Sequence, residues 1–277
     1  MRTLALLAIA ALVALAGCTV PAAEPRPDEP WPQYPPSTPG TISAWPSVGD
    51  ALIRPGVQVV SPTGQCTSNF VFASPDNATL YLGLAAHCVE GLELGTEVDI
   101  GKAAKGRLAY SSWATMADIG EKDEAVLDVN DFALIEIDPS ARKLVHPSVR
   151  HFGGPTALAD SGSVARGDKV LTYGNSGLRQ QIDPASWHEG YVVETRDRST
   201  TVYTVTPGVP GDSGSAVLTG DGRALGILVT LTILPTTGSN GVTHLDRALD
   251  YAREHAGLDA RLATWPLEDP GLLPPLP

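Results

Sequence analysis

The sequence is short of basic residues and of cysteine. Its 277 residues include 19 Lys and Arg against 31 Asp and Glu, which gives a net charge of -12. Such a chain has no electrostatic attraction for a phosphate backbone, so we do not expect a nucleic-acid partner. Three cysteines cannot all pair within one chain, so one of them needs a separate role. There is also no internal repeat of fixed period, and no strand–helix alternation of the kind seen in solute-binding proteins.

Apolar residues and turn formers are, in contrast, plentiful. Hydrophobic residues make up 43% of the chain and charged residues 18%, which suffices for a substantial core and excludes a wholly disordered chain. The 28 Gly and 24 Pro indicate many turns rather than long helices. A helical bundle is therefore a poor candidate.

The N-terminus has the pattern of a secretory signal. Arg2 supplies a positive charge, and residues 4–15 form an uninterrupted apolar run. The run ends in Leu-Ala-Gly-Cys at 15–18, which resembles the lipobox of bacterial lipoproteins and implies a signal peptide over 1–17 and diacylation (palmitate) of Cys18. An ordinary signal peptide and a short membrane anchor are the alternatives. Two acyl chains on Cys18 would hold the protein stably at a membrane.

Proline-rich segments flank the central part of the chain. Closely spaced prolines in 18–47 favour extended conformations, so we interpret this segment as a tether that carries the lipidated Cys18. A proline-rich ligand for a partner is the alternative. Residues 265–277 are predicted to be a second irregular, proline-rich tail, which leaves 48–264 as the folded domain.

Short apolar runs separated by turn residues fill this domain. They predict an all-β fold, a sandwich or barrel of antiparallel strands. The expected strands lie at 56–60, 69–73, 80–84, 97–100, 132–137, 169–173, 191–194, 200–206, 215–218 and 224–231. Apolar residues at helical spacing over 245–256, followed by Gly257, predict one helix near the C-terminus.

Three polar residues stand in surroundings suited to nucleophilic catalysis. His87 follows two small alanines, and its imidazole could accept the proton of a serine hydroxyl. Asp131 begins an apolar strand, where it could be buried against that imidazole and fix its tautomer. Ser213 lies in Gly-Asp-Ser-Gly, whose glycines bring backbone N–H groups close to a ligand. The other five histidines lack comparable surroundings.

The motifs Ala-Ala-His-Cys at 85–88, Asp-Phe-Ala-Leu at 131–134 and Gly-Asp-Ser-Gly at 211–214 resemble those of the chymotrypsin/trypsin-like serine proteases. The chain order His, Asp, Ser also matches that family. The resemblance covers about 57–256. It implies a double antiparallel β-barrel of chymotrypsin type, with two six-stranded barrels and the active site between them. We expect the predicted C-terminal helix to follow the second barrel.

The resemblance also implies roles for single residues. Ser213 would be the nucleophile, His87 the base and Asp131 its orienting partner, while the N–H groups of Gly211 and Ser213 would form the oxyanion hole. Cys66 and Cys88 resemble the disulfide that ties the histidine segment to its neighbour. Too few further Cys or His lie close by for a metal site, so neither a metal nor a cofactor is expected.

Two departures from the family pattern concern activation and specificity. No Ile-Val-Gly-Gly-like start is visible to supply an amino group for Asp212, so we expect Arg179 to pair with Asp212 instead. Pro207 stands where trypsin-type enzymes place an Asp, which removes support for a Lys or Arg preference. Val229 stands near a usual Ser and Leu231 near a usual Gly. These substrate-binding positions predict a small or apolar preference.

The sequence thus predicts a serine endopeptidase that cleaves peptides or proteins by way of an acyl-enzyme. We expect it to be secreted, monomeric and lipid-anchored through Cys18 on the outer face of the bacterial cell membrane. The alternative is a catalytically silent binding module on the same scaffold at the cell surface.

Overall fold

The computed structural model describes residues 45–179, 186–232 and 238–268, with the backbone alone for 230–232. The chain divides into two units, residues 1–33 and 34–277, and the described residues all belong to the second. The predicted signal peptide, Cys18 and most of the tether lie outside the described residues. Within these ranges, no helix has the length and apolar character needed to span a membrane.

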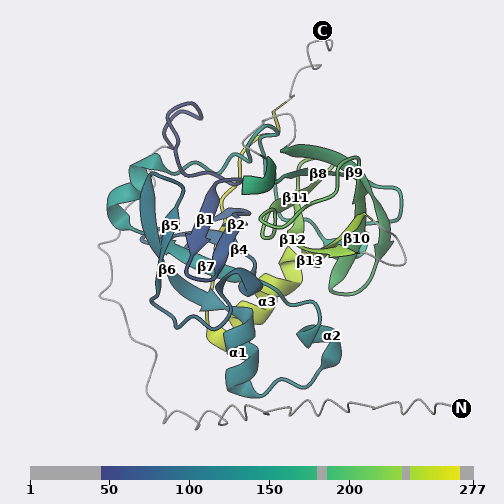
Figure 1. Ribbon diagram of the computed structural model, residues 1–277, viewed down its shortest axis with the longest axis horizontal. Helices are drawn as coiled ribbons and strands as arrows, with labels where there is room; N and C mark the ends of the chain where they lie inside the picture. The colour runs from purple at the N-terminus through teal and green to yellow at the C-terminus, as the bar shows by residue number, and fades with distance from the viewer. Residues whose placement is uncertain (1–44, 180–185, 233–237, 269–277) are drawn as a thin grey trace, which may run out of the picture. The chain divides into compact units, whose positions relative to one another are not determined.

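Most of the regular secondary structure of the described chain is β-strand, as predicted (Figure 1). The strands are β1 (Gln58–Ser61), β2 (Gly64–Thr67), β3 (Val71–Ala73), β4 (Leu80–Leu84), β5 (Glu97–Ile100), β6 (Ala104–Ser111), β7 (Ala133–Ile137), β8 (Lys169–Tyr173), β9 (Trp187–Thr195), β10 (Ser199–Thr204), β11 (Ala216–Thr219), β12 (Ala224–Thr232), β13 (Ser239–His244) and β14 (Arg261–Leu262). The helices are α1 (Ser112–Ile119), α2 (Glu124–Leu127) and α3 (Leu245–Ala256), with short 3-10 turns η1 (Ala86–Val89), η2 (Pro139–Leu144), η3 (Ser161–Ser163) and η4 (Gly177–Arg179).

The strands form two antiparallel systems. The first, here called the sheet half, has eight strands in the order β14-β3-β4-β7-β6-β5-β1-β2. The second, the barrel half, is a closed six-stranded barrel in the order β10-β13-β12-β11-β8-β9. The predicted all-β fold is confirmed. The N-terminal system has eight strands rather than six, because β2 and the late strand β14 are added at its two ends.

Alternation along the barrel strands explains how the core is divided. In β8, Val170 joins an apolar cluster to which all six barrel strands contribute, whereas Leu171 joins the main core shared with the sheet half. In β11, Val217 and Leu218 divide in the same way. Successive side chains of a strand point to opposite faces. The valines therefore fill the barrel, and the leucines bind it to the sheet half.

Helix α3 confirms the predicted C-terminal helix residue for residue. It begins at Leu245, ends at Ala256 and has Gly257 as a left-handed C-cap. Its apolar face, which includes Leu245 and Ala252, is buried in the main core. The helix contacts α1, β12 and β13, so it joins the two halves (Figure 1).

The start of the proline-rich tail is ordered against the domain. Trp265 donates its N–H to Pro155 O at 2.8 Å, and Glu268 donates to Phe152 O at 2.9 Å. Residues 269–277 lie outside the described residues.

Candidate active site

The register of two neighbouring strands brings His87 and Asp131 together. Leu84 at the end of β4 pairs with Ala133 at the start of β7. His87 follows β4 by three residues on η1, and Asp131 precedes β7 by two. Antiparallel pairing places those two chain ends at the same edge of the sheet. The fully buried Ala85 and Ala86 allow η1 to pack closely against this edge.

The two residues are joined by two hydrogen bonds. His87 Nδ1 lies 2.6 Å from one carboxylate oxygen of Asp131, and the His87 backbone N–H donates to the other at 2.9 Å. Side-chain exposure is 28% for His87 and 10% for Asp131. Burial acts to lower the pKa of His87, but the hydrogen bond and charge of Asp131, with Glu90, outweigh it and raise that pKa above 6.5.

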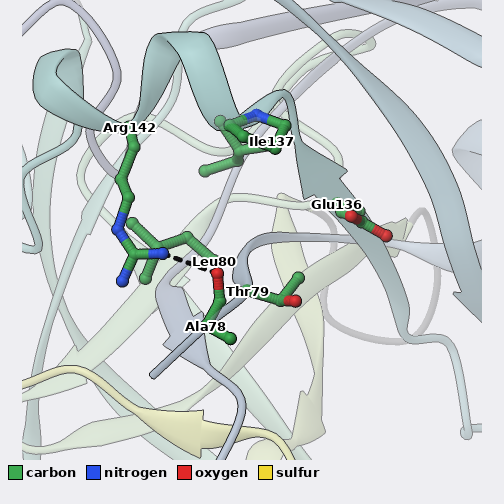
Figure 2. Close-up of a pocket in the computed structure, with 7 residues that line it drawn as sticks. Ala78, Thr79, Leu80, Glu136, Ile137 and Arg142 are labelled. Atoms are coloured by element: carbon green, nitrogen blue, oxygen red, sulfur yellow. Dashed lines mark hydrogen bonds between the residues drawn. The ribbon is translucent and has the colours of Figure 1, made fainter. Parts of the chain in front are cut away.

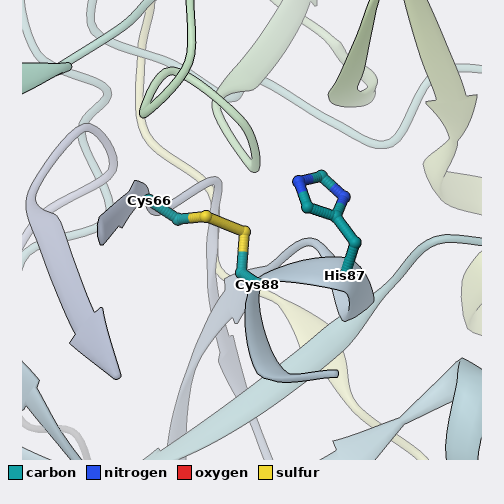
Figure 3. A group of neighbouring side chains, drawn as sticks. All are labelled: Cys66, His87 and Cys88. Carbon is teal, nitrogen blue, oxygen red and sulfur yellow. A yellow bond between two sulfur atoms is a disulfide. The ribbon is translucent and has the colours of Figure 1, made fainter. Parts of the chain in front are cut away.

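The predicted disulfide is present beside this pair. Cys66 on β2 is bonded to Cys88 on η1, with a Cα–Cα distance of 6.2 Å (Figure 3). A ring nitrogen of His87 lies within 4.8 Å of the two sulfur atoms. Because these sulfurs are bonded to each other, they offer no thiolate to a metal ion. The disulfide therefore fixes the segment that carries His87.

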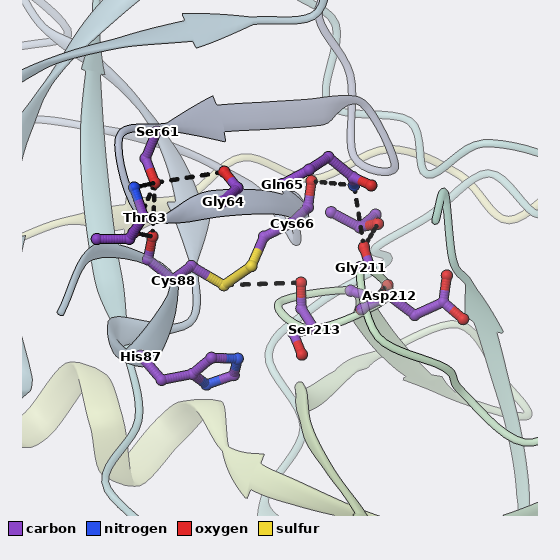
Figure 4. Close-up of a disulfide and its surroundings, with 12 residues drawn as sticks. Ser61, Thr63, Gly64, Gln65, Cys66, His87, Cys88, Gly211, Asp212 and Ser213 are labelled. Atoms are coloured by element: carbon purple, nitrogen blue, oxygen red, sulfur yellow. Dashed lines mark hydrogen bonds between the residues drawn. A yellow bond between two sulfur atoms is a disulfide. The ribbon is translucent and has the colours of Figure 1, made fainter. Parts of the chain in front are cut away.

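Ser213 lies in a tight turn facing this segment. Gly211 and Gly214 have φ values of +96° and +90°, which non-glycine residues rarely adopt. Thr67 of β2 donates its N–H to Ser213 O at 2.9 Å and its hydroxyl to Gly211 O at 2.7 Å. The Ser213 carbonyl oxygen is also 4.0 Å from Cys88 Sγ (Figure 4). The sheet half thus holds the turn of the barrel half.

Two backbone N–H groups of this turn remain available. The N–H groups of Asp212, Gly214 and Ser215 donate to carbonyl oxygens. Those of Gly211 and Ser213 donate to none of the described residues. The Ser213 hydroxyl and His87 Nε2 likewise form no hydrogen bond with each other or with any other described group. The imidazole ring is directed toward the Ser213 loop (Figure 4). The turn thus leaves the Ser213 hydroxyl and two N–H donors unused.

The predicted Arg179–Asp212 pair is confirmed beneath the turn. Arg179 Nε and Nη2 lie 2.9 and 2.5 Å from one oxygen of Asp212, and the two side chains are only 9% and 1% exposed. The same carboxylate accepts N–H groups from Ser176 and Val209, both at 3.0 Å. These contacts satisfy the buried charge of Asp212 within the chain.

The three residues predicted to shape a specificity pocket differ in how closely they are linked to the Ser213 turn. The Pro207 carbonyl oxygen accepts a hydrogen bond from Arg179 Nη2 at 2.9 Å. Val229 is partly buried against the main core. Leu231 pairs with Asn240 in the barrel, but its side chain lies outside the described part. Of these three residues, Pro207 is therefore the one linked to the Ser213 turn. The link runs through its hydrogen bond to Arg179 and the ion pair of Arg179 with Asp212.

Several residues of the site carry no motif and were not predicted. Thr67 and Gln65 bind the Gly211 carbonyl oxygen from β2, and Trp113 of α1 has its ring centroid 6.3 Å from that of His87. Ser112, at the start of α1, binds the backbone on either side of Asp131. Each acts through backbone contacts or packing, which leave no recognisable pattern in one sequence.

Two pockets on the described surface are lined by none of the residues of the candidate site. One, of about 10 Å³, holds at most a single water and is lined by Leu80, Glu136 and Arg142, among others (Figure 2). The other, of about 320 Å³, lies between Asp168 and Asp221. Neither contacts His87, Asp131 or Ser213, so we do not assign the candidate chemistry to them.

Comparisons with known protein families and solved structures agree with the fold described above. The family model described as trypsin-like peptidase domain matches residues 59–227. Thermobifida fusca Protease A is similar in structure, with 18% identity, a TM-score of 0.51 and coverage of 76% of this chain and 98% of its own. The comparison with curated proteins finds no match.

Two further solved structures are similar. One is a glutamic acid specific serine protease described as using a novel histidine triad in substrate binding, with 16% identity, a TM-score of 0.52 and coverage of 76% and 100%. The other is a Glu endopeptidase in complex with MPD, with 14% identity, a TM-score of 0.52 and coverage of 78% and 96%. At such identities the likeness establishes the chymotrypsin-like fold.

Proposed function

The chain belongs to the trypsin-like peptidase family, and on that premise we propose that it is a serine endopeptidase acting through His87, Asp131 and Ser213. One observation carries the proposal. His87 Nδ1 lies 2.6 Å from Asp131, beside a turn in which the N–H groups of Gly211 and Ser213 donate to no described residue. A base with its orienting acid, a serine and two unused donors are the parts that acyl transfer requires.

In the proposed reaction, Ser213 Oγ attacks the carbonyl carbon of a peptide bond while its proton moves to His87 Nε2. Asp131 holds the imidazole in the correct tautomer and stabilises the imidazolium. His87 then protonates the leaving amine, and an acyl-enzyme forms on Ser213. Water then attacks the ester carbonyl as His87 takes its proton, and His87 returns that proton to Ser213 Oγ as the acid is released.

The N–H groups of Gly211 and Ser213 would bind the oxyanion of each tetrahedral intermediate. Donors already aimed at the place where negative charge develops contribute about 3 kcal/mol each to the transition state. The Thr67 and Gln65 contacts to the Gly211 carbonyl hold this peptide in place. The oxyanion hole is thus proposed to be organised before the substrate binds.

The experiment that tests the proposal is labelling of the purified protein with a fluorophosphonate, together with assays on casein and a mixed peptide library. We expect an adduct on Ser213 and peptide cleavage. Ser213→Ala should lose both, while Ser163→Ala, which changes an exposed serine on η3, should still react. An unlabelled and inactive wild-type protein would instead support the catalytically silent binding module.

We further propose that substrates carry a small or apolar residue before the cleaved bond. Pro207 supplies no negative charge at the position where trypsin-type enzymes have one, and its carbonyl oxygen already binds Arg179. The peptide library therefore covers basic, acidic, small and apolar residues. Cleavage after Lys or Arg would overturn this preference.

The site is proposed to be competent without N-terminal cleavage. Asp212 already has a buried cationic partner in Arg179, so no new amino group is needed to hold the Ser213 turn. Full activity of protein that retains residues before 58 would support this. Activity appearing only after proteolysis in that segment would exclude it.

Finally, we propose secretion and tethering to the outer face of the bacterial cell membrane by diacylated Cys18. The lipobox-like segment 15–18 and the proline-rich stretch after it support the proposal. Cys18→Ser should abolish incorporation of labelled palmitate and release the protein into the soluble fraction. Retention of the variant on membranes would point to the uncleaved apolar run as the anchor.

A further inference from the structure

Among the described residues, a single one, His87, holds the carboxylate of Asp131. Both of its oxygens bind His87, one through Nδ1 and one through the backbone N–H. No other described residue hydrogen-bonds this carboxylate. The direction of the Asp131 side chain must therefore be set by its own backbone.

That backbone is fixed on both sides by one hydroxyl. Ser112 Oγ donates to Asn130 O at 2.7 Å and accepts the N–H of Phe132 at 3.0 Å. The Ser112 N–H also donates to Phe132 O at 2.8 Å. Asn130 O and the Phe132 N–H belong to the peptides immediately before and after the Asp131 Cα, and Phe132 O belongs to the next peptide. Together they determine where its Cα–Cβ bond points.

The segment around Asp131 is buried. Ser112 is fully buried, and Asn130 and Phe132 are 4% and 0% exposed. Water cannot replace the Ser112 hydroxyl there without repacking. A further hydroxyl, Thr243 Oγ1 of the barrel half, binds Val129 O at 2.6 Å, one residue farther from the site. Of these two hydroxyls, that of Ser112 thus binds the backbone closer to Asp131.

We propose that Ser112 is a positioning residue of the active site, which aims the Asp131 carboxylate at His87 by bridging the peptides on either side of it. This inference rests on the proposed function for its kinetic consequence, but the bridge itself is a property of the fold. Ser112 touches neither substrate nor reacting atoms. Its effect passes through Asp131 to His87.

The consequence should be specific to catalysis. If the bridge is lost, Asp131 moves relative to His87, and a displacement of about 1 Å in a catalytic group lowers kcat by about 100-fold. KM should stay within about twofold, because no substrate contact changes. His87 is faced by the charged groups Asp131 and Glu90. Weakening the first shifts the acid limb of the kcat profile to lower pH.

The test compares Ser112→Ala with Thr115→Val in the full-length protein. Thr115 is matched, because its buried hydroxyl lies in the same helix and donates one hydrogen bond, to Ser111 O, away from Asp131. We expect Ser112→Ala to lose kcat and to shift the acid limb, with Thr115→Val near wild type. Ser112→Cys, which fills the same space with a weak hydrogen-bonding group, should lie between.

A second readout needs no turnover. The proton between His87 Nδ1 and Asp131 should give a low-field NMR signal in the wild type that is weakened or shifted in Ser112→Ala and unchanged in Thr115→Val. If Ser112→Ala does not fold, Ser112→Cys carries both measurements.

Wild-type kcat, acid limb and NMR signal in Ser112→Ala, or equal losses in both helix variants, would overturn the inference. A wild-type protein that neither cleaves peptides nor takes the fluorophosphonate would refute the proposed function instead. The NMR comparison would still decide on Ser112.

Discussion

The sheet half and the barrel half hold their parts of the candidate site by different means. In the sheet half, His87 and Asp131 meet because β4 and β7 are paired in register, and a disulfide and the Ser112 bridge fix the two segments. In the barrel half, the turn that bears Ser213 depends on Thr67 from the other half and on the buried Arg179–Asp212 pair.

In the sheet half, strand pairing, the disulfide and Ser112 share the support of the candidate site, whereas in the barrel half a few contacts around the Ser213 turn provide it. Loss of strand pairing or of the disulfide should destabilise the sheet half as a unit. Damage to the ion pair should leave a charge buried next to the serine turn, where few other contacts can compensate. The two halves are therefore expected to fail in distinguishable ways, and the following variants test this.

The largest effect is expected from Asp131→Asn. The amide keeps the shape of the side chain but favours the wrong imidazole tautomer, so kcat should fall by about 10⁴-fold. The acid limb of the profile should also move to lower pH, because Asp131 raises the pKa of His87. Measured rates on the best peptide substrate, with unfolding followed in parallel, check both.

The control for this prediction is Asp128→Asn. Asp128 is an exposed carboxylate at the end of α2, close to Asp131 in sequence. Equal rates for the two variants would mean that Asp131 has no special role.

Next in size is the effect of Arg179→Ala. Removing the guanidinium leaves Asp212 buried without a cationic partner, which should lower the free energy of unfolding by about 3–5 kcal/mol. Labelling of Ser213 should fall as well, since Asp212 adjoins it. Urea unfolding and fluorophosphonate labelling measure the two effects.

Arg223→Ala is the matched comparison for this variant. Arg223 pairs with Asp221 at 3.0 Å on the surface, with both side chains more than half exposed. Exposed pairs contribute about 0–1 kcal/mol. If Arg179→Ala costs no more than Arg223→Ala, the buried pair does not support the turn.

A smaller loss is expected for the disulfide. The bond spans a sequence separation of 22 residues, so in the chain-entropy model its removal should cost about 3 kcal/mol. The variant Cys66→Ala/Cys88→Ala should lose this stability, while Arg179–Asp212 remains formed. Urea unfolding measures this loss, and a cost no larger than that of Arg223→Ala would contradict a stabilising role of the disulfide.

The sequence predicted those helices and strands that depend on patterns of neighbouring residues. Gly257 and the spacing of Leu245 to Ala256 predicted α3, and all ten expected strands are present: β4, β5 and β8 have the predicted ends, and the others have shifted ends. The disulfide and the Arg179–Asp212 pair followed from the family resemblance and are confirmed. In contrast, β2, β6, β13 and β14 were missed, since Gly106 and the polar residues of β2 and β13 interrupt the apolar alternation.

The missed parts of the site share a physical cause. Ser112 and Thr67 act on backbone groups that are distant in sequence, and any residue type could supply those groups. Helix α1, which carries Ser112 and Trp113, has a mixed pattern whose buried residues, Thr115 among them, are partly polar. Such contacts depend on tertiary packing, which overrides local propensity.

The last comparison sets His188 of the barrel half against His87. His188 on β9 is 3% exposed, its Nδ1 binds the Thr206 hydroxyl, and its Nε2 is buried with no hydrogen-bond partner. Burial, and then the charge of Arg179, lower its pKa to about 4, with Asp212 opposing. The unfolded chain takes up this proton near pH 6.5, so stability should fall as the pH drops from 6.5 toward 4. His87, whose pKa is raised, acts with the opposite sign: its contribution is complete below pH 6.5 and is lost as the pH rises through the raised value.

Urea unfolding of the wild type, His188→Gln and His87→Gln at several pH values separates the two histidines. Between pH 6.5 and about 5, the wild type should lose about 2 kcal/mol more than His188→Gln, because each pH unit costs about 1.4 kcal/mol for one proton bound only by the unfolded chain. His146 and His244, whose pKa values are also lowered by burial, remain in every variant, so their contributions cancel in the difference. The wild type should instead exceed His87→Gln most below pH 6.5, where the contribution of the His87–Asp131 pair is complete, and this difference should shrink as the pH rises through the raised pKa of His87. Parallel curves for the wild type and His188→Gln would show that the barrel half accommodates a charge at His188, and the contrast between the halves would then rest on Arg179 and Asp212 alone.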